Sequence, residues 1–220
     1  MSVLQPIISI LTVPSVVLFP HALLDLKVAE GQLDCTAGEW LAEGALWGIA
    51  TLRGSTPSSV LGRRSAALFR TVGIGHIVHR ERSNGCIRRL VLEGLVRGRI
   101  VDHGTRPGVP AVQVEILRDL VNVEGARRKD LAREFAEMVR VARQVAASEA
   151  DLRDVIRQVL SSHPHPGVVA DLLAHNCVRD LYARQSILAE LDVGRRVRLV
   201  QIQLAQIINH QTLQPLRRFR

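Results

Sequence analysis

The chain has 220 residues, 47% of them hydrophobic, and a net charge of +8. This length allows one large domain or two small ones, with a core that needs neither disulfides nor metals. No apolar run reaches the roughly 18 uncharged residues of a membrane span, and the apolar start lacks the basic leader and cleavage site of a signal peptide. We therefore expect a cytoplasmic protein without membrane contact. Its three cysteines, Cys35, Cys86 and Cys177, are expected to be free thiols.

The residues before 118 fall into short apolar runs that are typical of β-strands. Every second residue is apolar in 24–28 and 112–116, the pattern of a half-buried strand. Asn84-Gly85 suits the tight turn of a hairpin, and Glu93-Gly94 and Arg106-Pro107-Gly108 predict two further reversals. Short strands at this spacing predict an antiparallel, nearly closed barrel. The predicted strands are 7–11, 15–18, 24–28, 47–52, 74–79, 87–92, 95–101 and 112–117, with a short helix at 34–44 and a surface loop at 54–66.

After residue 118 the apolar spacing becomes helical. Five residues of a first helix share one face: Leu131, Phe135, Met138, Ala142 and Val145. Residues 148–151 (SEAD) resemble a capping box that opens a second helix, and 161–167 break the chain. A third helix is predicted through Val169, Leu172, Leu173 and Leu181, and Asp192 is the predicted N-cap of the last one. The sequence thus predicts an α+β protein with a β-rich barrel in 1–118 and a helical bundle in 119–220.

Familiar catalytic signatures are missing from the sequence. Lys27 and Lys129 are the only lysines, and neither lies in a phosphate-binding Gly-x4-Gly-Lys-Ser/Thr loop or has the setting of a Ser-Lys hydrolase. There is no Gly-x-Ser-x-Gly elbow. The best metal-ligand candidates are Asp171 and His175, four residues apart with Cys177 nearby, although a pair on a helix surface explains them more simply. We therefore predict no cofactor and disfavour an enzyme.

Several segments match one family in order and spacing. Residues 10–21 (ILTVPSVVLFPH) are similar to the opening of the N-terminal, substrate-binding domain of Lon proteases, in which an apolar strand leads into Val-Val-Leu-Phe-Pro-Gly or a close variant. Residues 72–100 resemble its most diagnostic stretch, a strand, a hairpin and a strand ending in an apolar-x-Gly-x-x-Arg-x-x-Ile run. The remaining matches are 24–30 (LDLKVAE), 47–50, 166–174 and 185–196, so the resemblance covers essentially the whole chain.

The resemblance implies a PUA-like pseudo-barrel followed by a helical bundle, and a role in recognising proteins or peptides. In complete Lon enzymes an ATPase and a Ser-Lys protease follow this domain, whereas this sequence stops at Arg220. We therefore expect a stand-alone, non-catalytic member. The family's Phe-Glu-Pro-Arg-Tyr is replaced here by residues 29–33 (AEGQL), which keep only the glutamate, Glu30.

The leading functional hypothesis is a module that captures a polypeptide substrate or one protein partner, such as a separate protease or ATPase. Apolar residues at the rim of a groove between barrel and bundle would hold an extended segment. The candidate binding residues are Phe19, His21, Glu30, Trp40 and Trp47, and core packing is the alternative for Phe19 and Trp47.

The second hypothesis is RNA binding through an arginine-rich face of the barrel. Its candidate phosphate contacts are Arg88, Arg89, Arg97 and Arg99, and strand alternation places Arg97 and Arg99 on one face. A solvated barrel surface is the alternative for these arginines. The hypothesis is weakened by an aromatic content of only 3%, which is poor for base stacking.

Overall fold

The computed structural model describes residues 5–28, 42–53, 68–84, 86–106, 109–121, 125–163 and 165–217. The chain divides into two compact units, Met1–Arg118 and Asp119–Arg220, and each is described by itself. The first is built from strands and the second from helices, so the predicted α+β class is confirmed.

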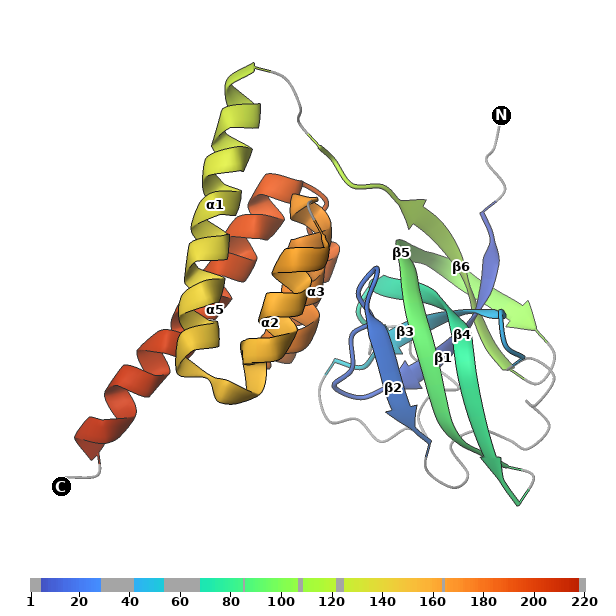
Figure 1. The fold of residues 1–220 in the computed structure, drawn as a ribbon. Helices are drawn as coiled ribbons and strands as arrows, with labels where there is room; N and C mark the ends of the chain where they lie inside the picture. The colour runs from blue at the N-terminus through green and yellow to red at the C-terminus, as the bar shows by residue number, and fades with distance from the viewer. Residues whose placement is uncertain are drawn as a thin grey trace. The chain divides into compact units, whose positions relative to one another are not determined.

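The described part of the first unit contains six strands (Figure 1). They are β1 (Ile7–Val13), β2 (Leu23–Lys27), β3 (Leu46–Thr51), β4 (Thr71–Ser83), β5 (Cys86–Arg106) and β6 (Val109–Leu117). Their order in the sheet is β2-β5-β4-β3-β1-β6, and β5 also pairs with β6. This last pairing closes β5, β4, β3, β1 and β6 into a ring. The strand β2 lies beside the first half of β5, outside the ring.

Strand alternation fills the interior of the barrel. In β2 the side chains of Leu24 and Leu26 are buried, whereas Leu23, Asp25 and Lys27 point outward. Two clusters of buried apolar residues make up the core. One includes Leu18, Trp47, Ile77, Leu90 and Leu92, and the other includes Ile8, Ile10, Val72, Ile74 and Val114.

The segment before β2 lies against the barrel without being a strand. The sequence predicts a strand at 15–18, and this prediction is wrong, because the chain turns at 14–15 and residues 16–19 do not adopt strand structure. A Cβ atom on Gly73 would lie 1.9 Å from the carbonyl oxygen of Leu18, and one on Gly94 would lie 2.0 Å from that of Phe19. The missing side chains therefore let this backbone lie directly on β4 and β5.

Two reversals of the chain agree with their predictions and one does not. Asn84 has a φ of 53°, and Ser83 pairs with Cys86, as expected of the hairpin. Arg106 pairs with Val109 in the next reversal. The reversal predicted at Glu93-Gly94 is wrong, because β5 runs through it. A register shift in β4 between Ile74 and Gly75 lies opposite this point, so Gly94 marks a bulge and not a turn.

One pair of strands departs from the antiparallel arrangement that the sequence predicts for the barrel. Strands β1 and β3 pair in parallel, with Ser9 opposite Trp47 and Val13 opposite Thr51. Parallel neighbours need a long connection that returns the chain to the same end. Here that connection includes β2 and residues 29–41. Most of the short helix predicted at 34–44 lies outside the described residues. The whole of the loop predicted at 54–66 also lies outside them.

Among the residues that the structure describes, the second unit contains five helices. They are α1 (Gly125–Ser148), α2 (Ala150–Ser162), α3 (Pro166–Cys177), α4 (Leu181–Ala189) and α5 (Val193–Arg217). No helix in the described part of the chain is long and apolar enough to span a membrane. The sequence predicts one helix where the structure has two, α3 and α4. Asp180 is the N-cap of α4, because its side chain accepts a 2.7 Å hydrogen bond from the Ala183 amide. Asp192 is confirmed as a cap, since its carboxylate accepts from the Arg195 amide at 2.9 Å.

The capping box predicted at 148–151 does not form. Ser148 is the last residue of α1, and its hydroxyl donates to the Val145 carbonyl at 3.1 Å. The N-cap of α2 is Glu149, whose side chain makes no capping hydrogen bond. Ser148 therefore belongs to α1 and cannot act as the N-cap residue that a capping box of α2 requires.

One buried arginine joins three parts of the helical unit. The side chain of Arg196 on α5 is 0% exposed. Its Nη1 donates to Asp119 Oδ1 at 2.9 Å and to the Glu190 carbonyl at 3.2 Å, and its Nη2 donates to the second Asp119 oxygen. Its Nε lies 3.4 Å from a carboxylate oxygen of Asp171 on α3, an ion-pair distance without hydrogen-bond geometry. This arginine therefore neutralises two carboxylates, one of them buried.

Replacing Gly94 by alanine is expected to destabilise the barrel by about 3 kcal/mol, because the new methyl group would overlap the Phe19 carbonyl. Urea unfolding followed by the fluorescence of the buried Trp47 measures the loss. The comparison variant is Gly44→Ala, at a φ of +82° with no atom within 4 Å of the new Cβ. It should cost only the left-handed backbone penalty of about 1–2 kcal/mol. Equal losses in the two variants would contradict the close approach.

Replacing Arg196 by leucine is expected to cost about 3–5 kcal/mol, because it removes the arginine whose charge neutralises the buried Asp171 carboxylate. Arg198→Leu is the control, since Arg198 is half exposed and pairs with Glu134 near the surface. It should cost less than about 1 kcal/mol. Thermal unfolding followed by circular dichroism at neutral pH compares the two variants, and a milder effect of Arg196→Leu would show that the buried cluster is dispensable.

Candidate polypeptide-binding surface

Four residues from four neighbouring strands form one row on the outer face of the barrel. Leu23 lies opposite Glu93, and Glu93 lies opposite His76. His76 in turn lies opposite Leu46. Directly opposed residues have Cβ atoms about 4.5–5.5 Å apart, so adjacent side chains in this row can touch. We call Leu23, Glu93, His76 and Leu46 the outer row.

The outer row has apolar ends and a polar centre. Leu23 is 62% exposed and Leu46 is 51% exposed, unusually high fractions for leucines within strands. Between them, His76 Nε2 lies 3.5 Å from Glu93 Oε2. Two exposed aliphatic side chains thus flank a pair of groups that can hydrogen-bond. This combination suits an extended peptide, which offers apolar side chains and a polar backbone.

A second polar pair lies on the same face, with Asp25 two residues after Leu23 in β2 and Arg89 four residues before Glu93 in β5. Arg89 donates to the two carboxylate oxygens of Asp25, from Nε at 2.8 Å and from Nη2 at 2.6 Å. The hydrogen bonds from Arg89 lower the pKa of the Asp25 carboxyl. The same hydrogen bonds raise the pKa of the Arg89 guanidinium. The pair joins β2 to β5 and borders the outer row on one side.

The structure places the predicted peptide-binding residues differently. Phe19 is 0% exposed and Trp47 is 2% exposed, so both belong to the core and neither reaches a rim. Both rings pack in the core, which is the alternative to binding that the sequence left open for these two residues. His21 is exposed, and its amide donates to the Gly94 carbonyl at 2.8 Å, next to Glu93 of the outer row. Glu30 and Trp40 lie outside the described residues.

The four arginines proposed as phosphate contacts do not form an open stripe. Arg97 is 3% exposed, so it does not share a solvent face with Arg99 as alternation predicted. Arg99 is half exposed and pairs with Glu115 at 3.4 Å. Arg89 pairs with Asp25, and Arg88 is half-buried. A phosphate would have to compete with carboxylates for two of these guanidinium groups.

Sequence reasoning missed Leu23 and Leu46. The signal for Leu23 was available, because burying Leu24 and Leu26 on alternating positions turns their neighbour Leu23 outward. Leu46 precedes Trp47 in the same way. Their joint membership of one row depends on the pairing of β2, β5, β4 and β3, which the sequence does not specify.

The side chains considered for metal binding have other surroundings. Asp171 is 1% exposed and lies 3.4 Å from Arg196, so it does not lie on the helix surface as expected. Cys177 is buried, and burial raises the pKa of its thiol to about 12, so it stays protonated at neutral pH. Within the described ranges, no three His, Cys, Asp or Glu side chains gather as metal ligands would.

The fold of this chain is similar to that of solved Lon N-terminal domains. The N-terminal domain of Mycobacterium avium complex Lon protease matches 91% of this chain and 98% of its own length, with a TM-score of 0.67 and 17% identity. A Lon N-terminal domain protein from Xanthomonas campestris matches 88% of this chain and 95% of its own, with a TM-score of 0.53 and 18% identity. These likenesses define the fold class.

The family follows from the sequence comparison. The model of the ATP-dependent protease La (LON) substrate-binding domain matches residues 7–206, so the chain belongs to this family and the predicted resemblance is confirmed. Lon protease 2 of Myxococcus xanthus is 24% identical over 195 residues, and Lon protease of Anaeromyxobacter dehalogenans (strain 2CP-C) is 23% identical over 195 residues. The chain spans 23% and 22% of the lengths of these relatives.

The lowered pKa of Asp25 gives a test of the surface geometry. In an NMR titration, the Asp25 carboxyl should have a midpoint below that of an ordinary aspartate, and Arg89→Gln should move it back. The stabilisation from this pair is then complete above the ordinary pKa of aspartate and is lost as the pH falls through the lowered one. Glu137, whose pKa is lowered by Arg140 on α1, is the control and should not respond. An unchanged Asp25 midpoint in Arg89→Gln would exclude the pair.

Proposed function

We propose that this protein is a non-catalytic recognition module that binds exposed apolar segments of other polypeptides on the outer row. The observation that carries the proposal is the exposure of Leu23 and Leu46 at the two ends of one cross-strand row. Membership of the Lon substrate-binding family supports a polypeptide as the ligand.

The size of the apolar contact predicts weak, transient binding. Burying an exposed leucine completely contributes about 1.5–3 kcal/mol, so the two leucines together contribute about 3–6 kcal/mol. Part of this is offset by the loss of freedom of the peptide. The resulting dissociation constant for one segment is about millimolar. Such a surface selects segments by exposed apolar character and releases them readily, which suits the presentation of unfolded chains to another protein.

The polar centre of the outer row has a role in orienting the segment. His76 and Glu93 lie between the leucines, where a peptide backbone would pass if its side chains packed on both ends. The imidazole and the carboxylate can satisfy backbone groups that lose water on binding. We propose that the bound chain is passed to a separate protease, such as a Lon-type enzyme, or to a separate ATPase. The ATPase supplies the energy for unfolding, and the protease cleaves the peptide bonds.

The test is binding of a chemically denatured, labelled protein to the full chain. The double variant Leu23→Ser/Leu46→Ser should weaken binding by about tenfold or more, because it removes both apolar ends. Its matched control is Leu120→Ser/Ile202→Ser, which removes two leucine-sized side chains that are 59% and 53% exposed on the helical unit. All four residues are at the surface, so thermal unfolding should change little.

Three outcomes would reject the proposal. One is an equal loss of binding in both double variants. Another is retention of full binding by Leu23→Ser/Leu46→Ser. The third is preferential capture of an RNA oligonucleotide over the denatured protein, with an affinity that falls steeply as salt is raised, since this behaviour marks phosphate contacts.

A further inference from the structure

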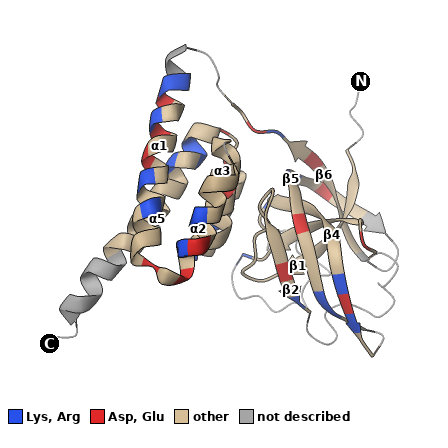
Figure 2. Ribbon diagram, in the orientation of Figure 1, with Lys and Arg blue, Asp and Glu red and all other residues tan. Residues whose placement is uncertain are grey.

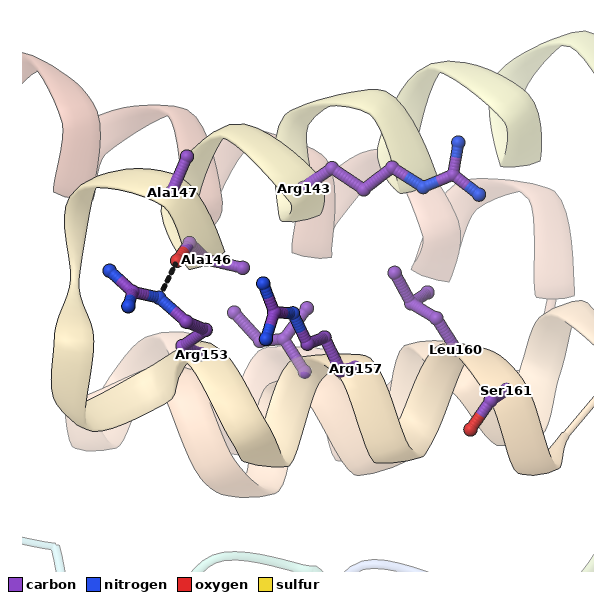
Figure 3. A pocket seen from close by; sticks show the side chains of 8 residues that line it. Arg143, Ala146, Ala147, Arg153, Arg157, Leu160 and Ser161 are labelled. Carbon is purple, nitrogen blue, oxygen red and sulfur yellow. Dashed lines mark hydrogen bonds between the residues drawn. The ribbon is translucent and has the colours of Figure 1, made fainter.

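A second surface with the features of a binding site lies on the helical unit, between α1 and α2. It is a hollow of about 690 Å³, and its lining residues are Arg143, Ala146, Ala147, Arg153, Ile156, Arg157, Leu160 and Ser161. Arg143 comes from α1, whereas Arg153 and Arg157 rise from α2 (Figure 3). We call this hollow the arginine groove.

The floor of the arginine groove is apolar. Ile156 is 0% exposed and Ala146 is 7% exposed, and both belong to the packed contact between the two helices. Leu160 is half-buried and Ala147 is exposed. An aliphatic side chain entering the groove would therefore find carbon surface beneath it.

The rim of the groove carries three positive charges without carboxylate partners. Among the residues that the structure describes, no ion pair reaches Arg143, Arg153 or Arg157. This contrasts with Arg140 and Arg198, which pair with Glu137 and Glu134 elsewhere on the unit. Basic residues are spread along both α1 and α2, and the carboxylates of α2 do not line the groove (Figure 2).

When no ligand is bound, the positive charges of the arginine groove repel one another. Arg153 and Arg157 are four residues apart on α2, so they share one face of the helix and repel each other. One interaction of Arg153 is structural, because its Nε donates to the Ala146 carbonyl at 3.1 Å in the last turn of α1. Nothing comparable holds Arg143 or Arg157, which are exposed within the described part of α1 and α2. A bound anion would relieve the repulsion.

We propose that the arginine groove binds an acidic amphipathic segment of another polypeptide, in which carboxylates flank an aliphatic side chain. Charge complementarity selects the carboxylates, since guanidinium groups bind them through paired, charge-assisted hydrogen bonds. The apolar floor selects the aliphatic side chain between them. Nucleic acid is disfavoured, because no aromatic residue for base stacking lines the groove within the described part of the chain.

This site is separate from the outer row, which belongs to the barrel unit, and it selects different chemistry. The outer row takes apolar segments of any charge, whereas the arginine groove requires acidic ones. The two activities can therefore be abolished one at a time.

The experiment measures the fluorescence anisotropy of a labelled peptide that carries glutamates around leucines at helical spacing, titrated with the full chain. The native protein should bind it more tightly than the peptide with glutamine in place of glutamate. Arg143→Gln/Arg157→Gln should weaken binding by about tenfold or more. The matched control is Arg128→Gln/Arg179→Gln, which removes two exposed arginines outside the groove and should leave binding within about twofold.

A second pair of variants tests the site without removing any arginine. Ala147→Glu places a carboxylate in the groove, four residues after Arg143 on α1, and should exclude the acidic peptide as strongly as the double variant does. Ala147→Gln has the same size without the charge and should bind as the native protein does. Both changes are at an exposed helical position and leave the fold intact.

The proposal is overturned if the glutamate and glutamine peptides bind equally well, or if the two arginine double variants lose binding equally. It is also overturned if an oligothymidine strand binds the groove in preference to the acidic peptide. Loss of self-association in Arg143→Gln/Arg157→Gln, measured by light scattering, would assign the groove to a second copy of the chain instead. Leu23→Ser/Leu46→Ser should still bind the acidic peptide, so failure of the outer row leaves this test informative.

Discussion

The barrel depends on the direct contact between the backbone of Leu18 and Phe19 and the glycines of β4 and β5. Any side chain at Gly73 or Gly94 would occupy the same space as a carbonyl of this segment. The contact also fixes the start of β2, because Gly94 exchanges hydrogen bonds with Ala22 and His21. Strand β2 therefore starts in register with β5, and this register brings Leu23 opposite Glu93. The proposed binding surface is thus a consequence of a packing constraint on the opposite side of the same strands.

The helical unit depends on a different kind of interaction. Arg196 lies at the start of α5 and is in contact with Asp119 before α1, Asp171 in α3 and the Glu190 carbonyl after α4. A buried charge cluster of this kind is a modest source of stability, although removing one member of it is costly. It connects the first turn of α5 with the middle of α3 and with the residues before α1 and after α4. The groove between α1 and α2 forms away from this cluster, where Arg153 holds the two helices together through a carbonyl.

The two proposed surfaces divide recognition by chemistry. The outer row offers exposed leucines around the polar side chains of His76 and Glu93, so its selectivity is for apolar character. The arginine groove offers an apolar floor with unneutralised charge, so its selectivity is for carboxylates. Salt distinguishes the two, because screening weakens contacts between exposed charges and leaves apolar contacts largely intact.

The sequence by itself determined the features that depend on near neighbours. Alternation at 24–28, the Asn84 turn, the helical face of Met138, Ala142 and Val145, and the Asp192 cap all follow from interactions within a few residues, and all agree with the structure. The class of the fold and its family were accessible for the same reason, because they combine such local signals in order.

Only the tertiary structure decided the features that depend on distant partners. The parallel pairing of β1 with β3, the course of residues 15–19 over two glycines, and the continuation of β5 through Gly94 each depend on a strand remote in sequence. Burial removed Phe19, Trp47 and Arg97 from the candidate surfaces, and it did so because the barrel closes around them. Leu23 and Leu46 meet in one row only through the register of two intervening strands. Local propensity specifies which face of a strand is apolar, whereas the closure of the sheet decides which neighbours that face receives.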